Sequence, residues 1–256
     1  MVAVPWNILF IPLAHSMRRK ILKILLATMI VTASAFGGLY AYCTKDMPPM
    51  DVFRDPAKHA RLLETKYPLP QEGSYNIQPL AYEEIPKQII DIFLESSNPL
   101  YFSRDGHEFG CLNSPVDHLI KLFGTDFIRS RYLADYHIRY DMIRLLRHRL
   151  AFSLDKQQIL CAYLNTIQLP DDVFGINAGA RYFFNKDAKN LTLAESVTLM
   201  LLEQTKWMNR ETVSSNINTR RDRILKRLLD ADRITLDAYD SAVSEKINVP
   251  AMGIVQ

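Results

Sequence analysis

Cysteine is scarce in this sequence, and the few cysteines form no recognisable motif. Cys43, Cys111 and Cys161 stand far apart, without a C-x-x-C pair or zinc-ligand spacing. An odd number of widely spaced cysteines argues against a disulfide framework, so we expect free thiols. A phosphate loop, a zinc motif and a visible Ser-His-Asp constellation are also lacking. These absences argue against the common nucleotide-dependent, zinc-dependent and serine-hydrolase classes.

A strong charge of one sign is lacking as well. The chain has 31 Lys and Arg against 28 Asp and Glu, a formal net charge of +3, so nothing indicates a nucleic-acid partner. Strand signals are few and short. Beyond Pro86 the apolar residues recur mostly at helical spacing, as at Ile138, Met142 and Leu145. The sequence therefore predicts a mainly α-helical domain.

One long uncharged run stands near the N-terminus. Residues 24–43 carry no charge, and about twenty apolar residues span a bilayer core. A basic cluster precedes the run, so we predict a transmembrane anchor at 21–43, with residues 1–20 in the cytoplasm and the rest outside. A cleaved signal peptide is the alternative, although large aromatics stand where a cleavage site needs small residues. Met17, just before the basic cluster, is a candidate for the true start.

The remainder divides by composition into two parts. Residues 44–79 are rich in proline and polar residues and predict a linker, whereas residues 80–248 predict the globular domain. Within that domain, Ser153 is expected to cap a following helix. Thr192, with Glu195 three residues later, has the pattern of a capping box.

Four short patterns in the second half of the chain point to one family. They are ILCAYLN at 159–165, GINAGARYFFNK at 175–186, LTLAESVTLMLL at 191–202, and RRDRIL at 220–225. Together they resemble glycosyltransferase family 51, the peptidoglycan glycosyltransferases, which occur alone or as the first catalytic domain of class A penicillin-binding proteins. The likeness covers about residues 80–245. It implies a lysozyme-like, mainly α-helical domain, here of the monofunctional type, behind one N-terminal transmembrane helix.

The resemblance assigns a role to Glu95. The family's first motif reads Glu-Asp-x-x-Phe, followed by His-x-Gly. Glu95 is placed at the Glu and Ser96 at the Asp, and Tyr101 or Phe102 reaches the Phe position after about two extra residues. Gly106 then takes the glycine and Arg104 the histidine. The implied role of Glu95 is the general base that deprotonates the 4-hydroxyl of the acceptor sugar.

The second essential acid of the family falls on Asp141 when two extra residues are allowed. The leaving pyrophosphate needs cations, and Asp141 is expected to support it through Mg²⁺ or another divalent metal. The expected pyrophosphate contacts are Arg104, Arg129, Arg131, Arg139 and Arg144. A solvated helix face remains the other interpretation of this basic run. Cys161 stands where the family often has a Glu.

The implied function is polymerisation of lipid II into glycan strands at the outer face of the cytoplasmic membrane. The expected partners are lipid II, the membrane and a transpeptidase or other cell-wall synthesis proteins. Because the catalytic motifs are altered, the alternative is a degenerate relative that binds lipid II or glycan, or that acts as a scaffold for cell-wall enzymes. A peptidoglycan-cleaving enzyme that uses a lone Glu is a third interpretation.

Overall fold

The structure is a computed structural model of the chain, and it describes residues 15–44, 50–66, 78–96, 114–124, 136–205, 210–247 and 249. These residues are mainly helical. Among them no β-strand is present, and the β-structure amounts to isolated bridge residues, such as the pair Gln168 and Phe174. The predicted mainly α fold is therefore confirmed, while the lysozyme-like arrangement stays a prediction. The chain forms two compact units, Met1–Met47 and Pro48–Gln256.

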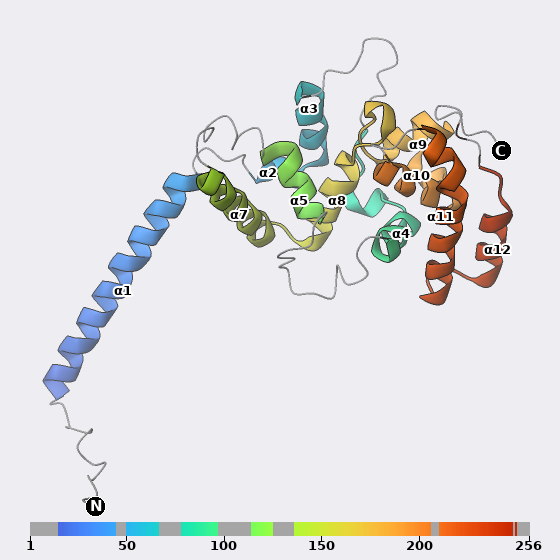
Figure 1. Cartoon of the computed structure of the whole chain (residues 1–256). Coiled ribbons are helices and arrows are strands. Elements are labelled where there is room, and N and C mark those ends of the chain that lie inside the picture. The colour runs from blue at the N-terminus through green and yellow to red at the C-terminus, as the bar shows by residue number, and fades with distance from the viewer. Residues whose placement is uncertain are drawn as a thin grey trace, which may run out of the picture. The chain divides into compact units, whose positions relative to one another are not determined.

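The longer elements follow one another along the chain (Figure 1). They are α1 (His15–Thr44), α2 (Asp51–Arg54), α3 (Pro56–Lys66), α4 (Lys87–Ser96), α5 (Pro115–Leu119), α7 (Tyr136–Ser153), α8 (Lys156–Thr166), α9 (Ile176–Phe184), α10 (Leu193–Thr205), α11 (Arg210–Asp230) and α12 (Leu236–Ser244). Short 3₁₀ and π turns join them. These are η2 (Tyr82–Glu84), η3 (Ile120–Gly124), η4 (Pro170–Asp172) and η5 (Ala188–Asn190).

Helix α1 contains the apolar run of the N-terminal region. Its stretch Arg19–Tyr42 is 24 residues long, has a mean hydropathy of 1.8 and is unburied. At 1.5 Å per residue this stretch is about 36 Å long, enough to cross a hydrocarbon core of about 30 Å. An N-terminal helix of spanning length is thus confirmed in the described part of the chain. A signal sequence meets the same criterion, so the anchor and its orientation stay predictions.

The predicted linker at 44–79 is wrong for its middle part, because residues 51–66 form α2 and α3. Phe53 and Leu63 are fully buried there, and α3 packs against α8. Pro56, one of the residues that suggested a linker, is the first residue of α3, where its missing N–H breaks no helical hydrogen bond. The guanidinium of Arg54 also donates to the carbonyl of Ser153 at 2.7 Å. The composition of this segment thus gave no sign that α2 and α3 form part of the folded domain.

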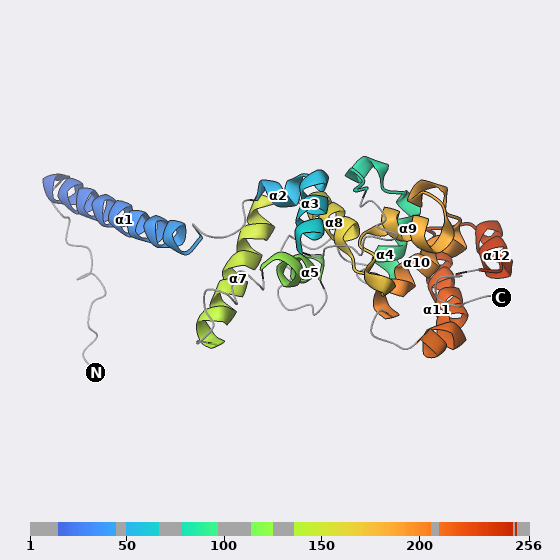
Figure 2. The same ribbon diagram turned by 90° about the horizontal axis from the view of Figure 1, so that it is seen from above.

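The main core lies among α4, α8, α9, α10, α11 and α12. All of these except α8 gather at one end of the domain in both views (Figure 1 and Figure 2). Helix α8 is buried on all sides from Ile159 to Thr166 and lies between this group and α3 and α5. Helix α10 contacts α4, α9, α11 and α12. Burial of all of 159–165 and of most of 191–202 explains why these stretches show little amphipathic alternation.

The two predicted helix caps have different outcomes. At the start of α10 the amide of Thr192 donates to Glu195 Oε2 at 2.9 Å, and the amide of Glu195 donates to Thr192 Oγ1 at 3.1 Å. This capping box is confirmed. Ser153 is the last residue of α7 instead, and Asp155 caps α8 through a reciprocal pair with Gln158. Asp155 accepts at 2.8 Å, in the geometry that an N-cap acid provides.

Gly175, just before α9, occupies a position that only glycine fits well. Its φ is 85°, and a Cβ there would lie 2.7 Å from the backbone oxygen of Asn165. We expect Gly175→Ala to lower the free energy of unfolding by about 2–4 kcal/mol, through backbone strain and overlap with a rigid backbone. Denaturant titration of the detergent-solubilised protein measures this change. Gly38→Ala in α1, where a Cβ meets nothing within 4 Å, is the control. Equal stability of the two variants would contradict the prediction.

Candidate functional site

Helix α4 carries the candidate base Glu95 on its polar side. Asp91 and Glu95 are four residues apart, so they project one helical turn apart on the same side. The side chain of Asp91 keeps 8% of its surface exposed and that of Glu95 keeps 12%. Glu95 is therefore a shielded carboxylate and not a solvated surface group. The opposite side of the helix packs into the core through Ile89, Ile92, Phe93 and Leu94.

Arg233 reaches this acidic side from the turn between α11 and α12. Asp232 has a left-handed φ of 53°. Its amide donates to the carbonyl of Leu229 at 3.0 Å, and the amide of Arg233 donates to that of Leu228 at 2.9 Å. These are the two hydrogen bonds of the Schellman motif that closes a helix. Thr235 then caps α12 by accepting from the amide of Ala238 at 3.2 Å. The backbone of Arg233 is thus fixed between two capped helices.

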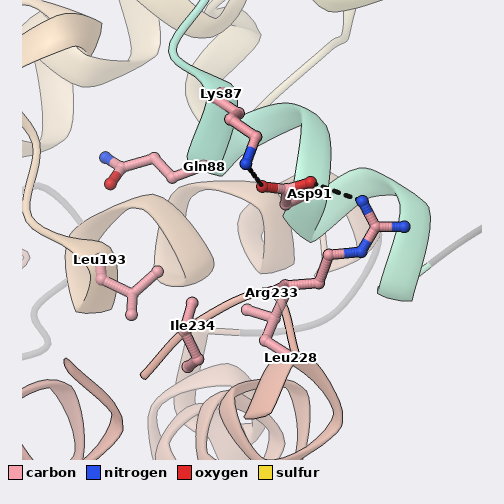
Figure 3. Close-up of a pocket in the computed structure, with 7 residues that line it drawn as sticks. All are labelled: Lys87, Gln88, Asp91, Leu193, Leu228, Arg233 and Ile234. Carbon is pink, nitrogen blue, oxygen red and sulfur yellow. Dashed lines mark hydrogen bonds and ion pairs between the residues drawn. The ribbon is translucent and has the colours of Figure 1, made fainter. Parts of the chain in front are cut away.

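The guanidinium of Arg233 faces both acids of α4. Its Nη1 donates to Asp91 Oδ1 at 2.8 Å, and its Nε lies 3.6 Å from Glu95 Oε1. The first distance is a hydrogen bond, whereas the second is an ion pair too long to be one. Lys87 approaches the other oxygen of Asp91 at 3.7 Å, so the carboxylate lies between two cations (Figure 3). Asp91 therefore holds Arg233 in place, and the positive charge of Arg233 lies beside the carboxylate of Glu95.

A small cavity of about 200 Å³ opens beside Asp91. Leu193, Leu228 and Ile234 supply its apolar wall, and Gln88 is held at its edge by donating to Ser196 Oγ at 2.8 Å. Sites for drug-sized ligands usually measure about 300–1,000 Å³. Glu95 is not part of the lining. The cavity is therefore a depression beside the ion pairs and not a groove for a polymerised glycan.

Tyr163 joins α4, α5 and α8 beneath the site. Its ring centroid lies 5.5 Å from that of Phe93 and 5.1 Å from that of His118, the latter edge-on. Ring nitrogen Nε2 of His118 lies 3.1 Å from the carbonyl oxygen of Thr166. Burial, reinforced by the charge of Glu203, raises the pKa of the Tyr163 phenol. Tyr163 thus acts as a neutral packing residue that supports the end of α4.

Asn165 fastens the segment that leads into α4. Its Oδ1 accepts from the amide of Leu80 at 2.8 Å, and its Nδ2 donates to the carbonyl of Leu80 at 2.8 Å and to that of Cys161 at 3.0 Å. Cys161 is a buried free thiol, and burial raises its pKa to about 11. The thiol is thus neutral at ordinary pH, so Cys161 does not supply the negative charge of the Glu that the family often has there.

The predicted pyrophosphate contacts cannot be assembled into one site. Arg104, Arg129 and Arg131 lie outside the described residues. Arg139 lies on α7, but its side chain is likewise not described, and Arg144 is exposed on the same helix. These five residues stay predictions. On α7 a different arginine, Arg147, forms an ion pair with Asp117 of α5.

The predicted metal ligand Asp141 lies on α7, and its side chain is also not described. Within the described residues, no group of three or more His, Cys, Asp or Glu side chains is placed to hold a metal ion. A divalent metal at Asp141 therefore stays a prediction.

Sequence reasoning did not identify two residues of this site. They are Arg233, which forms the ion pair with Glu95, and Asp91, which accepts a hydrogen bond from Arg233. Asp91 had a local signal, since two acids four residues apart share one helix face. Arg233 had none, because 142 residues separate it from Asp91. Only the packing of α4 against α11 brings them together.

Comparisons with known proteins converge on one family. Residues 144–229 match the transglycosylase family. Penicillin-binding protein 1A of Vibrio cholerae is 25% identical over 248 residues, which cover 90% of this chain and 30% of that protein. Penicillin-binding protein 4 of Bacillus subtilis is 25% identical over 266 residues, which cover 91% of this chain and 42% of that protein. The chain thus spans less than half the length of these relatives.

A solved structure is also similar. The crystal structure of penicillin-binding protein 1A from Haemophilus influenzae aligns with 67% of this chain and 18% of its own, at 23% identity and a TM-score of 0.42.

Proposed function

We propose that the chain is a membrane-anchored peptidoglycan glycosyltransferase, because residues 144–229 match the transglycosylase family and the chain is similar to penicillin-binding protein 1A of Vibrio cholerae. Its substrate would be lipid II, a glycan on a polyprenyl pyrophosphate, and its product a glycan strand. The anchor would be α1, with the basic cluster in the cytoplasm and residues from about 44 onward outside. Other cell-wall synthesis proteins are the expected partners.

The observation that supports this proposal is the environment of Glu95. An acid at the end of a core helix, with 12% of its side chain exposed, is shielded from bulk water yet lies at the domain surface. A general base needs reach to the hydroxyl that it deprotonates, and partial shielding preserves the strength of its interactions. The position also agrees with the catalytic Glu expected from the family resemblance.

In the proposed reaction Glu95 takes the proton of the acceptor's 4-hydroxyl. The hydroxyl oxygen bonds to the anomeric carbon of the donor, and the bond from that carbon to the lipid pyrophosphate breaks, with inversion. The pyrophosphate leaves with the bonding electrons, and cations stabilise its charge. The cations proposed for this role are Arg104, Arg129, Arg131, Arg139 and Arg144, with Asp141 holding a divalent metal that would add positive charge there.

A second candidate is a non-catalytic relative that binds lipid II or glycan. Its supporting observation is a count along the first motif. If Tyr101 is the motif's Phe and Gly106 its glycine, an unbroken Glu-Asp-x-x-Phe places the Glu at Ser97 and the Asp at Asn98. Glu95 would then be a structural partner of Arg233, and the chain would lack the base.

One assay separates the two candidates. The full-length protein, in detergent with Mg²⁺, is incubated with lipid II beside a Ser97→Glu/Asn98→Asp variant, and glycan chains are resolved by electrophoresis. The proposed enzyme makes glycan as the natural sequence. The non-catalytic candidate makes glycan only as the variant, or not at all, while retaining lipid II binding. A folded natural protein that binds lipid II but makes no glycan would refute the enzymatic proposal.

A further inference from the structure

We propose that Arg233 is a positioning residue for Glu95, held in place by Asp91. This inference rests on the proposed function, because it assigns Arg233 a part in the same reaction. Arg233 would not touch the substrate. It would fix where the carboxylate of Glu95 stands and keep a positive charge beside it.

The first support is the rigidity of the turn that presents Arg233. The Schellman hydrogen bonds at the end of α11 and the Thr235 cap of α12 leave its backbone little freedom. The 2.8 Å hydrogen bond to Asp91, which is itself 8% exposed, fixes the far end of the side chain. Because both the backbone and the guanidinium of Arg233 are held, its positive charge has a defined position.

The second support is the difference between the two contacts. Arg233 donates a directed hydrogen bond to Asp91, whereas its Nε lies 3.6 Å from Glu95 Oε1. At that distance the charge attracts the carboxylate without a directed hydrogen bond to it. Glu95 keeps its lone pairs for a substrate hydroxyl and is still drawn toward a fixed point. One turn of α4 separates the two acids, so a single guanidinium serves both.

The proposal predicts a specific pattern of rates in the lipid II assay. Arg233→Gln should lower kcat roughly 10- to 100-fold with KM unchanged, the scale expected when a reacting group is misplaced by about 1 Å. Arg233→Lys should recover part of kcat. A lysine restores the positive charge, but its single ammonium group does not contact both Asp91 and Glu95 as the guanidinium does. Lys87→Gln is the matched control, because Lys87 also approaches Asp91, and it should leave kcat unchanged.

An Arg233→Gln/Asp91→Asn variant separates positioning from structural support. Arg233→Gln alone leaves the shielded Asp91 with a weaker counter-charge, so some loss of thermal stability is expected. The double variant removes both charges and should regain stability. If Arg233 positions Glu95, kcat stays low in that stable double variant. If Arg233 only supports the fold, kcat returns together with stability, and the proposal is overturned.

Failure of this inference differs from failure of the proposed function. A natural protein that makes no glycan refutes the function, and the role of Arg233 falls with it. An active natural protein whose Arg233→Gln variant keeps full kcat refutes the role of Arg233 alone.

Discussion

Replacing Glu95 by glutamine is expected to lower the rate of lipid II polymerisation by at least about 100-fold, the lower end of what general base catalysis contributes. Glutamine has nearly the same shape as glutamate but cannot take the proton of the acceptor hydroxyl. Because 12% of the Glu95 side chain is exposed, bulk water has poor access to act as a substitute base. The loss should appear in kcat, measured as glycan formed per unit time at saturating lipid II.

The fold should survive this substitution. Glu95 gives up only an ion pair at 3.6 Å with an arginine whose side chain is 34% exposed, and such pairs contribute about 0–1 kcal/mol. Arg233 also keeps its hydrogen bond to Asp91. The thermal midpoint of Glu95→Gln should therefore stay close to that of the natural protein, and lost activity cannot then be ascribed to unfolding.

Glu83→Gln is the matched control, since the same change is made at an exposed acid of η2 in the segment before α4. It should polymerise lipid II at the natural rate. If Glu95→Gln and Glu83→Gln are equally active, Glu95 is not the base. An active natural protein would then need another acid, and Asp141→Asn becomes the next variant to assay.

Asn165→Ala is expected to lower the free energy of unfolding by about 3 kcal/mol or more. The variant removes both hydrogen bonds to Leu80 and the bond to the carbonyl of Cys161. Each buried polar group left without a partner costs about 1–3 kcal/mol. Because Asn165 is 2% exposed, water reaches the orphaned backbone groups only if the structure opens.

Two measurements check the Asn165 prediction. Denaturant titration gives the stability change, with Asn190→Ala, an exposed asparagine in η5, as the control that should lose little. Hydrogen exchange should quicken at the amide of Leu80, since its acceptor is gone. A variant as stable as Asn190→Ala, with natural exchange at Leu80, would show that the Asn165 contacts are not needed to hold this segment.

The features that the sequence predicted correctly are local. The capping box of Thr192 and Glu195 needs only residues three apart, and the apolar run in α1 needs only its own composition. The linker prediction is wrong at residues 51–66, because a composition rich in proline and polar residues does not show whether a short segment has a helix to pack against. Phe53 lies on α2 and Leu63 on α3, and both side chains are buried because this helical pair packs against α8.

The candidate site was predictable in part. The sequence could name Glu95 through a family motif, and it could have named Asp91 from its four-residue spacing. It could not name Arg233, which reaches α4 only because two capped helices meet in a left-handed turn at Asp232. The predicted arginines at 104, 129 and 131 fall outside the described residues, so neither their placement nor that of the Asp141 side chain has been tested.

The sequence by itself determined the helical class, the spanning-length N-terminal helix and the resemblance to the transglycosylase family, because each depends on patterns within one segment or on short motifs. The tertiary structure alone decided what surrounds Glu95. Packing of α4 against α11 sets a guanidinium between two acids that lie far from it in sequence. Local spacing cannot encode such a contact, since the strength and direction of an ion pair depend on distance and burial, which only the folded chain fixes.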